Sequence, residues 1–372
     1  MNFAFTEEQM QLRDSLRRFL TATYTLERRR AITRAGGGCD AQIWRQFAEL
    51  GILGLAIPES LGGIGGNAFD VMVVMEELGR ALVLEPYLST ALVGAGILVR
   101  AGSAQQQELL PAVAGGEVRL AFAHGERDSR WRLDAVTTRA VREGKGWVLE
   151  GSKAMVTDGA GAHYLVISAR TASGISLFLL PGTSERMTRT ALTTHDGAAV
   201  AEIRLDGVRL AADALIGTEG GGLPLIEAAS DVAIAGLCAE AVGAMDAVLA
   251  LTLEYVKSRR QFGAPIGSFQ ALQHRLADML LHAELARSMS YLASARLSIS
   301  DVMERRRALS AAKFLVGRSA RLIGQEAVQL HGGMGVSDEL STSHYFKRLT
   351  LLNASFGDMD HHLERFGSVM AA

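Results

Sequence analysis

The hydrophobic period of this 372-residue chain changes twice, and this change constrains its fold more than any other feature. Residues 1–115 and 223–372 place apolar side chains at steps of three and four, which is typical of amphipathic helices. Between them, residues 116–222 contain short strand-like runs, and two glycine clusters mark the borders. The sequence therefore predicts an α+β protein with an N-terminal helical domain, a middle β domain and a C-terminal helical domain.

The middle region holds five strand-like runs separated by turns such as Glu143–Gly146 and Asp206–Gly207. Turns this short join strands that run in opposite directions. We therefore predict a small antiparallel domain that closes into a barrel. Its runs are Ala135–Val141, Trp147–Glu150, Tyr164–Ala169, Ile175–Leu180 and Ala199–Leu205.

Composition excludes several classes of protein. With 48% hydrophobic residues the chain can bury a large core, and its formal net charge of -2 argues against nucleic acid as a partner. The apolar runs are too short or too rich in glycine to span a bilayer. Cys39 and Cys238 lack CxxC spacing and read as reduced thiols, and Thr6–Gln9 reads as a helix-capping box with no signal peptide before it. We therefore expect a cytoplasmic protein.

A break between two helical patterns carries the first candidate site. The first pattern ends near Arg259, Gly263 and Pro265 interrupt it, and a second pattern starts near Phe269. At such a corner a guanidinium can hold a pyrophosphate, and a nearby aromatic or amide can contact a ring. The local pattern alone favours an ordinary αα-hairpin with a surface cation.

Two motifs give this corner a cofactor. Arg-x-x-Phe-Gly followed by Gln resembles the cofactor motif of the acyl-CoA dehydrogenase family, and Gln329–Gly335 resembles a second motif of that family. The resemblance implies FAD, shared across a subunit boundary in a tetramer built from dimers. It also implies a middle β-barrel domain and a C-terminal four-helix bundle. Its FAD contacts fall on Arg259, Phe262, Gln270, Gln329, Gly332 and Gly333.

The same resemblance places two segments of the β domain beside the flavin ring. In Leu120–Ser129, Glu126 matches the family's Thr-Glu-Pro signature, and Gly125 replaces the hydroxyl residue but can offer its N–H. Gly151–Asp158 resembles Gly-x-Lys-x-Trp-x-Thr-Asn, with Met155 in the aromatic position. Thr157 would then hydrogen-bond the ring and Met155 would cover its face. The alternative is that both are ordinary strand residues.

The catalytic base is the feature that departs from the family. The implied reaction, α,β-dehydrogenation of an acyl-CoA, needs a base for the α proton and a flavin to accept the β hydride. Phe356 falls where the family places its Glu, and Ala233 falls at the alternative position on an earlier helix. The remaining candidates for the base are four carboxylates: Asp231, Glu240, Asp358 and Asp360. The resemblance also places Asp358 where the family's Thr contacts the flavin or its phosphates, so Asp358 is a cofactor-binding candidate as well, and a structural role is its equal alternative.

Three functions remain open at this point. The first is an FAD-dependent acyl-CoA dehydrogenase with a relocated base, and the second is a catalytically reduced subunit that completes FAD sites for a homologous partner. The variant run Phe356–His362 resembles chains of pimeloyl-CoA type and heteromeric sterol side-chain dehydrogenases. A flavin oxidase or monooxygenase is the third. We expect an electron-transfer flavoprotein as acceptor and no metal, because neighbouring Asp and His residues on a helix point to different faces.

Overall fold

The computed structural model describes residues 5–36 and 38–371. The chain divides into two compact units. Met1–Arg29, Ala68–Val83 and Ile234–Ala372 form one, which we call the helical unit. Arg30–Asn67 and Leu84–Ala233 form the other, which we call the sheet unit.

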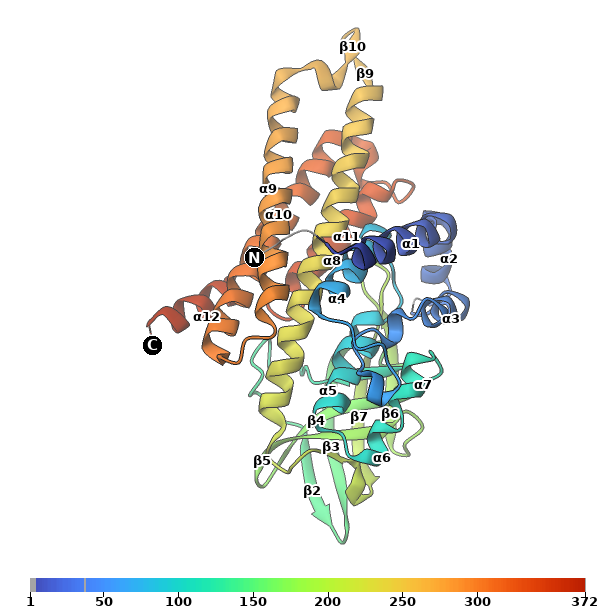
Figure 1. The fold of residues 1–372 in the computed structure, drawn as a ribbon, viewed down its shortest axis with the longest axis vertical. Coiled ribbons are helices and arrows are strands. Elements are labelled where there is room, and N and C mark those ends of the chain that lie inside the picture. The colour runs from blue at the N-terminus through green and yellow to red at the C-terminus, as the bar shows by residue number, and fades with distance from the viewer. Residues whose placement is uncertain (1–4, 37, 372) are drawn as a thin grey trace. The chain divides into compact units, whose positions relative to one another are not determined.

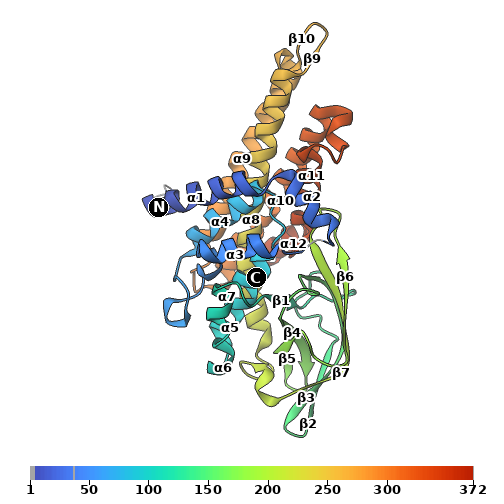
Figure 2. The same ribbon diagram turned by 90° about the vertical axis from the view of Figure 1, so that its right-hand side faces the viewer.

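The helical unit is built on long helices. Thr6 and Gln9 form the predicted capping box at the start of α1 (Glu7–Thr23), which confirms that prediction. In this unit α10 packs against α9, α11 and α12, and α1 packs against α4. Figures 1 and 2 show α8 and α9 rising side by side to a short hairpin. The other helices are α4 (Ala68–Arg80), α8 (Gly222–Ser258), α9 (Gln270–Arg296), α10 (Val302–His331), α11 (Ser341–Ala354) and α12 (Met359–Ala371).

Helix α8 is apolar enough over 18 residues to cross a membrane, but most of that stretch is buried inside the protein. It is therefore a core helix. Two glycines let it approach α4 backbone to backbone: a Cβ at Gly243 would overlap the carbonyl of Glu76, and one at Gly79 would overlap that of Glu240. Its first residues, up to Ala233, belong to the sheet unit.

The sheet unit contains an eight-stranded sheet in the order β6-β7-β3-β2-β4-β5-β8, with β1 added beside β4. Its buried core includes Trp147, Leu165, Phe178 and Ile203. The strands are β1 (Leu120–Ala123), β2 (Arg139–Glu143), β3 (Gly146–Thr157), β4 (Tyr164–Thr171), β5 (Gly174–Pro181), β6 (Met187–Thr193), β7 (Ala199–Leu210) and β8 (Leu215–Ile216).

Short helices complete this unit, and one of them is unusual. Residues Leu88–Gly94 form a π-helix, η3, which packs on β1. π-helical turns are rare and often occur at functional sites. The other helices are α2 (Leu26–Arg34), which begins in the helical unit, α3 (Ala41–Glu49), α5 (Ala95–Ala101), α6 (Ala104–Gln107) and α7 (Leu110–Ala114).

The sheet corrects the prediction of purely antiparallel pairing. Strand β4 pairs in parallel with both β1 and β2. Turn length predicts how consecutive strands pair, but β4 meets these two through long-range contacts. Sequence reasoning also missed β6, because most of its side chains are exposed and it therefore lacks a strong apolar alternation.

Candidate functional site

In the sheet unit, the ends of two strands bring Gly125, Met155 and Thr157 together. The amide of Ala154 donates to the carbonyl of Gly125 at 2.8 Å, which joins the two segments. The pairing of β3 with β7 shifts register between Lys153 and Val156, and Met155 takes a left-handed φ of 53°. At this bulge Met155 is 57% exposed and Thr157 is also exposed. A bulge that turns side chains outward next to a glycine is a common feature beside binding sites.

A buried ion pair lies beneath this surface. Lys153 Nζ donates to Glu126 Oε1 at 2.7 Å, and both side chains are almost fully enclosed. Thr137 and Thr138 each donate a backbone N–H and a hydroxyl to the same carboxylate. Burial alone would raise the pKa of Glu126, but the hydrogen bonds from Lys153 and Thr137 lower it to about 2. Glu126, the matched residue of the Thr-Glu-Pro signature, therefore holds the loop in place from below.

Lys153 extends this network to Ser168 and, through it, to His124. Its ammonium also donates to Ser168 Oγ at 3.0 Å, and Ser168 in turn lies 2.9 Å from Nδ1 of His124. Burial lowers the pKa of Lys153 to about 8, although Glu126 opposes this shift. Burial and the charge of Lys153 lower the pKa of His124 to about 4, so this imidazole is neutral at pH 7.

Two neighbours of Thr157 were missed by sequence reasoning. Ser89, from the π-helix, donates to the carbonyl of Thr157 at 3.5 Å. Asp158 follows Thr157 with a left-handed φ of 55° and faces Arg119 at 3.5 Å. Burial raises the pKa of Asp158 to about 6. Asp158 could have been found because it replaces the Asn of the motif, whereas no pattern in the sequence points to Ser89.

In the helical unit, Arg259, Phe262 and Gln270 surround the end of the α8–α9 hairpin, and all three are exposed. Helix α8 ends at Ser258 and α9 begins at Gln270, which confirms the predicted break. Between them, β9 (Arg260–Gln261) and β10 (Ala264–Pro265) flank a two-residue turn with positive φ at Phe262 and Gly263. Phe262 is 93% exposed. Its ring lies edge-on to that of Phe269, with the two centroids 6.2 Å apart. The positive φ and the exposed ring mark this tip as a candidate surface for contact with another molecule.

The second motif lies at the end of α10, where Gln329, Gly332 and Gly333 are all exposed. Within the described chain, nothing lies within 4 Å of a Cβ built on Gly332 or Gly333. Gly335, two residues on, is different, since its Cβ would lie 2.5 Å from the carbonyl of Val328. Close packing thus explains why residue 335 is a glycine, but it does not explain Gly333. Open glycines beside an exposed amide fit a group that approaches the backbone closely, such as the adenosine half of FAD.

The turn at Phe356 is fixed by two buried side chains. Lys313 Nζ donates to the carbonyls of Leu352, Asn353 and Gly357, each at 2.9 Å. His362 Nε2 lies 3.0 Å from the carbonyl of Phe356, so this nitrogen is the donor. Phe356 has a left-handed φ of 53°, and Gly357 has one of 105°. The turn is therefore rigid although its central side chain cannot accept a proton.

Asp358 and Glu240, two of the four candidate carboxylates, have structural partners. Asp358 Oδ1 accepts from the N–H of His361 at 2.9 Å at the start of α12. Glu240, on α8, accepts from Arg348 Nε at 2.6 Å in a buried ion pair. Asp360 is exposed. Asp231 is only 4% exposed and lies on the part of α8 that belongs to the sheet unit.

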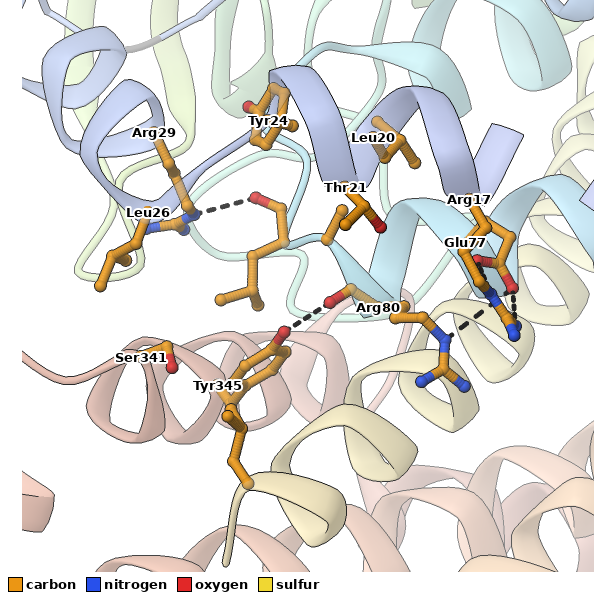
Figure 3. A pocket seen from close by; sticks show the side chains of 13 residues that line it. Arg17, Leu20, Thr21, Tyr24, Leu26, Arg29, Glu77, Arg80, Ser341 and Tyr345 are labelled. Carbon is orange, nitrogen blue, oxygen red and sulfur yellow. Dashed lines mark hydrogen bonds and ion pairs between the residues drawn. The ribbon is translucent and has the colours of Figure 1, made fainter. Parts of the chain in front are cut away.

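A separate pocket of about 280 Å³ lies in the helical unit, and none of the predicted site residues lines it. Figure 3 shows Arg17 and Arg80 reaching the same carboxylate, that of Glu77. Arg80 also pairs with Asp246 at 3.0 Å. Arg17 and Arg80 are matched by carboxylates, and Arg29 donates to the carbonyl of Leu82, so the pocket carries a polar network that joins helices.

Comparison with known proteins identifies the family of this chain. The N-terminal, middle and C-terminal domains of acyl-CoA dehydrogenases match residues 6–117, 121–208 and 220–370. A probable acyl-CoA dehydrogenase of Mycobacterium bovis, fadE25, is 30% identical over 78% of this chain and 77% of its own.

Two solved structures extend the comparison. A variant of the Tcur3481-Tcur3483 steroid ACAD is 30% identical, with a TM-score of 0.88 over 98% of both chains. A chain of the ChsE4-ChsE5 complex from Mycobacterium tuberculosis is 27% identical, with a TM-score of 0.90 over 100% of this chain and 99% of its own. This chain therefore belongs to the acyl-CoA dehydrogenase family, whose members are FAD-dependent oxidoreductases that act on acyl-CoA.

Proposed function

We propose that this chain is the FAD-completing subunit of a two-chain acyl-CoA dehydrogenase, in which a homologous partner supplies the catalytic base. One feature carries the proposal: Phe356 falls where the family resemblance places the base, and Lys313 and His362 hydrogen-bond to the turn that carries it. A benzyl side chain cannot remove a proton. Two of the candidate carboxylates already have structural roles, because Asp358 caps a helix and Glu240 pairs with Arg348.

The residues of this chain would divide the work of binding FAD. Arg259 would hold the pyrophosphate as a charge-assisted donor, with Phe262 and Gln270 beside it, across a subunit boundary. The exposed end of α10 with Gln329, Gly332 and Gly333 would take the adenosine half. When bound, FAD supplies the acceptor for the β hydride.

Residues of the sheet unit would meet the flavin ring. The N–H of Gly125 and the hydroxyl of Thr157 would donate to its polar edge, and Met155 would cover one face. The network of Glu126 and Lys153 supports this assignment, because it holds both segments without using the outward-facing groups. Backbone N–H groups of the Phe356 turn would hold the thioester carbonyl as its charge grows.

A two-chain assembly is supported by the relatives. The ChsE4-ChsE5 structure is a complex of two different proteins, and one of its chains matches this chain over its whole length. We extend the proposal to a dimer of dimers, to an electron-transfer flavoprotein as acceptor and to a cytoplasmic location. These extensions rest on the family resemblance and on the exposed, strained tip at Phe262.

The test is flavin bleaching under anaerobic conditions. The purified full chain is mixed with butyryl-CoA, octanoyl-CoA or a steroid side-chain acyl-CoA, and the absorbance of the oxidised flavin is followed. We expect FAD but no bleaching from the chain alone, and bleaching after a homologous chain from the same genome is co-expressed. Phe356→Glu should confer bleaching without the partner, because it restores a carboxylate on an intact turn. Bleaching by the unaltered chain alone would contradict the proposal.

A second candidate is a self-sufficient dehydrogenase whose relocated base is Asp231. The place of Asp231 favours it, because Asp231 lies on α8 two residues before Ala233 and is only 4% exposed. In that case the unaltered chain bleaches by itself, Asp231→Asn abolishes bleaching, and the control Asp358→Asn retains it. Peroxide release or a hydroxylated product would instead indicate a flavin oxidase or monooxygenase.

A further inference from the structure

Two FAD motifs of the helical unit are far apart in sequence, yet one pair of stacked rings joins them. Tyr255 lies in the last turns of α8, and His331 is the last residue of α10. Their ring centroids lie 4.3 Å apart with an interplanar angle of 25°. The hydroxyl of Tyr255 also donates to the carbonyl of His331 at 3.3 Å. The two helix ends are therefore fixed to each other at this point.

The imidazole of His331 is held on both nitrogens. Nδ1 lies 2.8 Å from the carbonyl of Ala327 and must donate there, because a carbonyl only accepts. Nε2 lies 3.3 Å from the hydroxyl of Thr342, on α11. With 5% exposure, His331 cannot reach a ligand itself. A ring so constrained can fix the backbone on either side of it.

Each partner of the stack stands next to a motif. The carbonyl of Tyr255 accepts from the N–H of Arg259 at 2.8 Å, so the guanidinium starts one helical turn beyond the stack. On the other side, Gly332 follows His331 directly with a φ of 61° and its N–H returns to the carbonyl of Gln329. The stack therefore fixes the backbone from which both the arginine motif and the glycine motif extend.

We propose that Tyr255 and His331 are positioning residues that hold the two motifs at the spacing of one FAD, so that the adenosine half and the pyrophosphate are gripped together. This inference rests on the proposed function. The inference predicts that the stack contributes to the higher affinity of the protein for FAD than for FMN, because FMN lacks the adenosine half. The open space beside Gly332 and Gly333 supports this inference. Among the described residues, nothing lies within 4 Å of a Cβ built on either glycine, so packing does not explain why Gly333 is a glycine.

The experiment compares two flavins on one protein. The full chain, in the assembly in which it purifies, is stripped of flavin and titrated with FAD and with FMN by fluorescence quenching. The variants Tyr255→Leu and His331→Leu should raise the FAD dissociation constant roughly tenfold, which is the order expected for a lost aromatic pair. Their FMN dissociation constants should stay within about twofold, since FMN makes no contact with the glycine motif.

Two control variants separate positioning from stability. Tyr255→Phe keeps the ring and should keep most of the preference for FAD. Tyr291→Leu removes another aromatic of the same unit, which packs 6.1 Å from Phe69, and should lower the melting temperature while leaving the preference unchanged. ADP as a competitor gives an independent readout: it should displace FAD from the unaltered protein but lose roughly tenfold in affinity in His331→Leu.

The outcomes distinguish this inference from the proposed function. If the unaltered protein binds no FAD, the proposed function fails and the inference fails with it. If FAD binds, but Tyr255→Leu and His331→Leu weaken FAD and FMN equally, the stack is merely structural and the inference alone is overturned. A selective loss of FAD affinity in both Leu variants, with the preference retained by Tyr255→Phe, supports it.

Discussion

Lys153 in the sheet unit and Lys313 in the helical unit are both almost fully buried, and burial lowers the pKa of each to about 8. Their partners differ. Lys153 meets a carboxylate, Glu126, whereas Lys313 meets three backbone carbonyls. Each ammonium holds a backbone segment that borders a candidate site.

This difference separates two ways of building a rigid site. In the sheet unit, opposite charges cancel, so removing either one exposes the other to a medium that solvates it poorly. In the helical unit, three carbonyl groups accept hydrogen bonds from one ammonium, and removing that ammonium leaves these neutral acceptors without a donor. The paired site should therefore be the more fragile to substitution, although both lysines are equally buried.

Lys153→Met should give the largest effect. It leaves the carboxylate of Glu126 buried with only the threonine donors, and loss of one partner of a buried pair typically costs about 3–5 kcal/mol of unfolding free energy. Urea denaturation followed by circular dichroism measures it. Lys145→Met, an exposed lysine of the β2–β3 turn, is the matched control and should cost less than about 0.5 kcal/mol. A cost below about 1 kcal/mol for Lys153→Met would break the comparison.

Lys313→Met should cost less, at roughly 2 kcal/mol, because the groups it leaves are neutral carbonyls. The same denaturation experiment measures it, with Lys347→Met as the more exposed control. Lys347 makes one ion pair, with Asp338, and its side chain is 33% exposed. A larger loss for Lys313→Met than for Lys153→Met would reverse the ranking.

The sequence predicted these sites unequally. The helical pattern, the glycine motifs and the break after Arg259 are local features, and each was found from nearby residues. Lys153 and Glu126 were also noted as parts of two motifs. However, they stand 27 residues apart, and nothing in either motif says that one neutralises the other. Their pairing depends on how β3 and the end of β1 meet, which is a property of the folded sheet.

Other features were invisible for the same reason. The π-helix at Leu88–Gly94 reads as any apolar helix, because the periods of α- and π-helices differ too little over seven residues. The parallel contacts of β4 depend on long-range register, which turn chemistry does not set. Asp358 could be placed near the catalytic position from sequence, but its capping of α12 required the geometry of the turn.

Lowering the pH should reduce the unfolding free energy by protonating Glu126, the partner of Lys153. The pKa of Glu126 is about 2 in the folded protein and about 4.5 when unfolded, so its stabilising contribution is full above pH 4.5. That contribution falls as the pH drops from 4.5 towards 2. The difference in unfolding free energy between the unaltered protein and Glu126→Gln should therefore shrink over this range. Denaturation curves at several pH values measure it, and a constant difference would contradict it.

Raising the pH should increase the unfolding free energy through Lys313. The pKa of Lys313 is about 8 when folded and about 10.5 when unfolded, so the unfolded chain binds more protons between these values. Unfolding free energy should thus rise with pH in the unaltered protein relative to Lys313→Met. Subtracting the two curves cancels the titration of groups that do not interact with Lys313. Cys238 is not one of them, because burial raises its pKa and the charge of Lys313 lowers it.

The smallest effects concern Asp358. Burial lowers the pKa of Lys313, and the charges of Cys238 and Asp358 oppose that shift. Asp358→Ala removes the side-chain acceptor for the N–H of His361 and should cost about 1 kcal/mol, as lost helix caps do. Asp358→Asn keeps that acceptor, because an amide oxygen also caps, and should cost only a few tenths of a kcal/mol. It removes the negative charge, however, and so should lower the pH at which Lys313 releases its proton. If Asp358→Asn and Asp358→Ala lower the unfolding free energy equally, the charge of Asp358 contributes more than its capping hydrogen bond. Lys313 would then have a carboxylate partner, as Lys153 does.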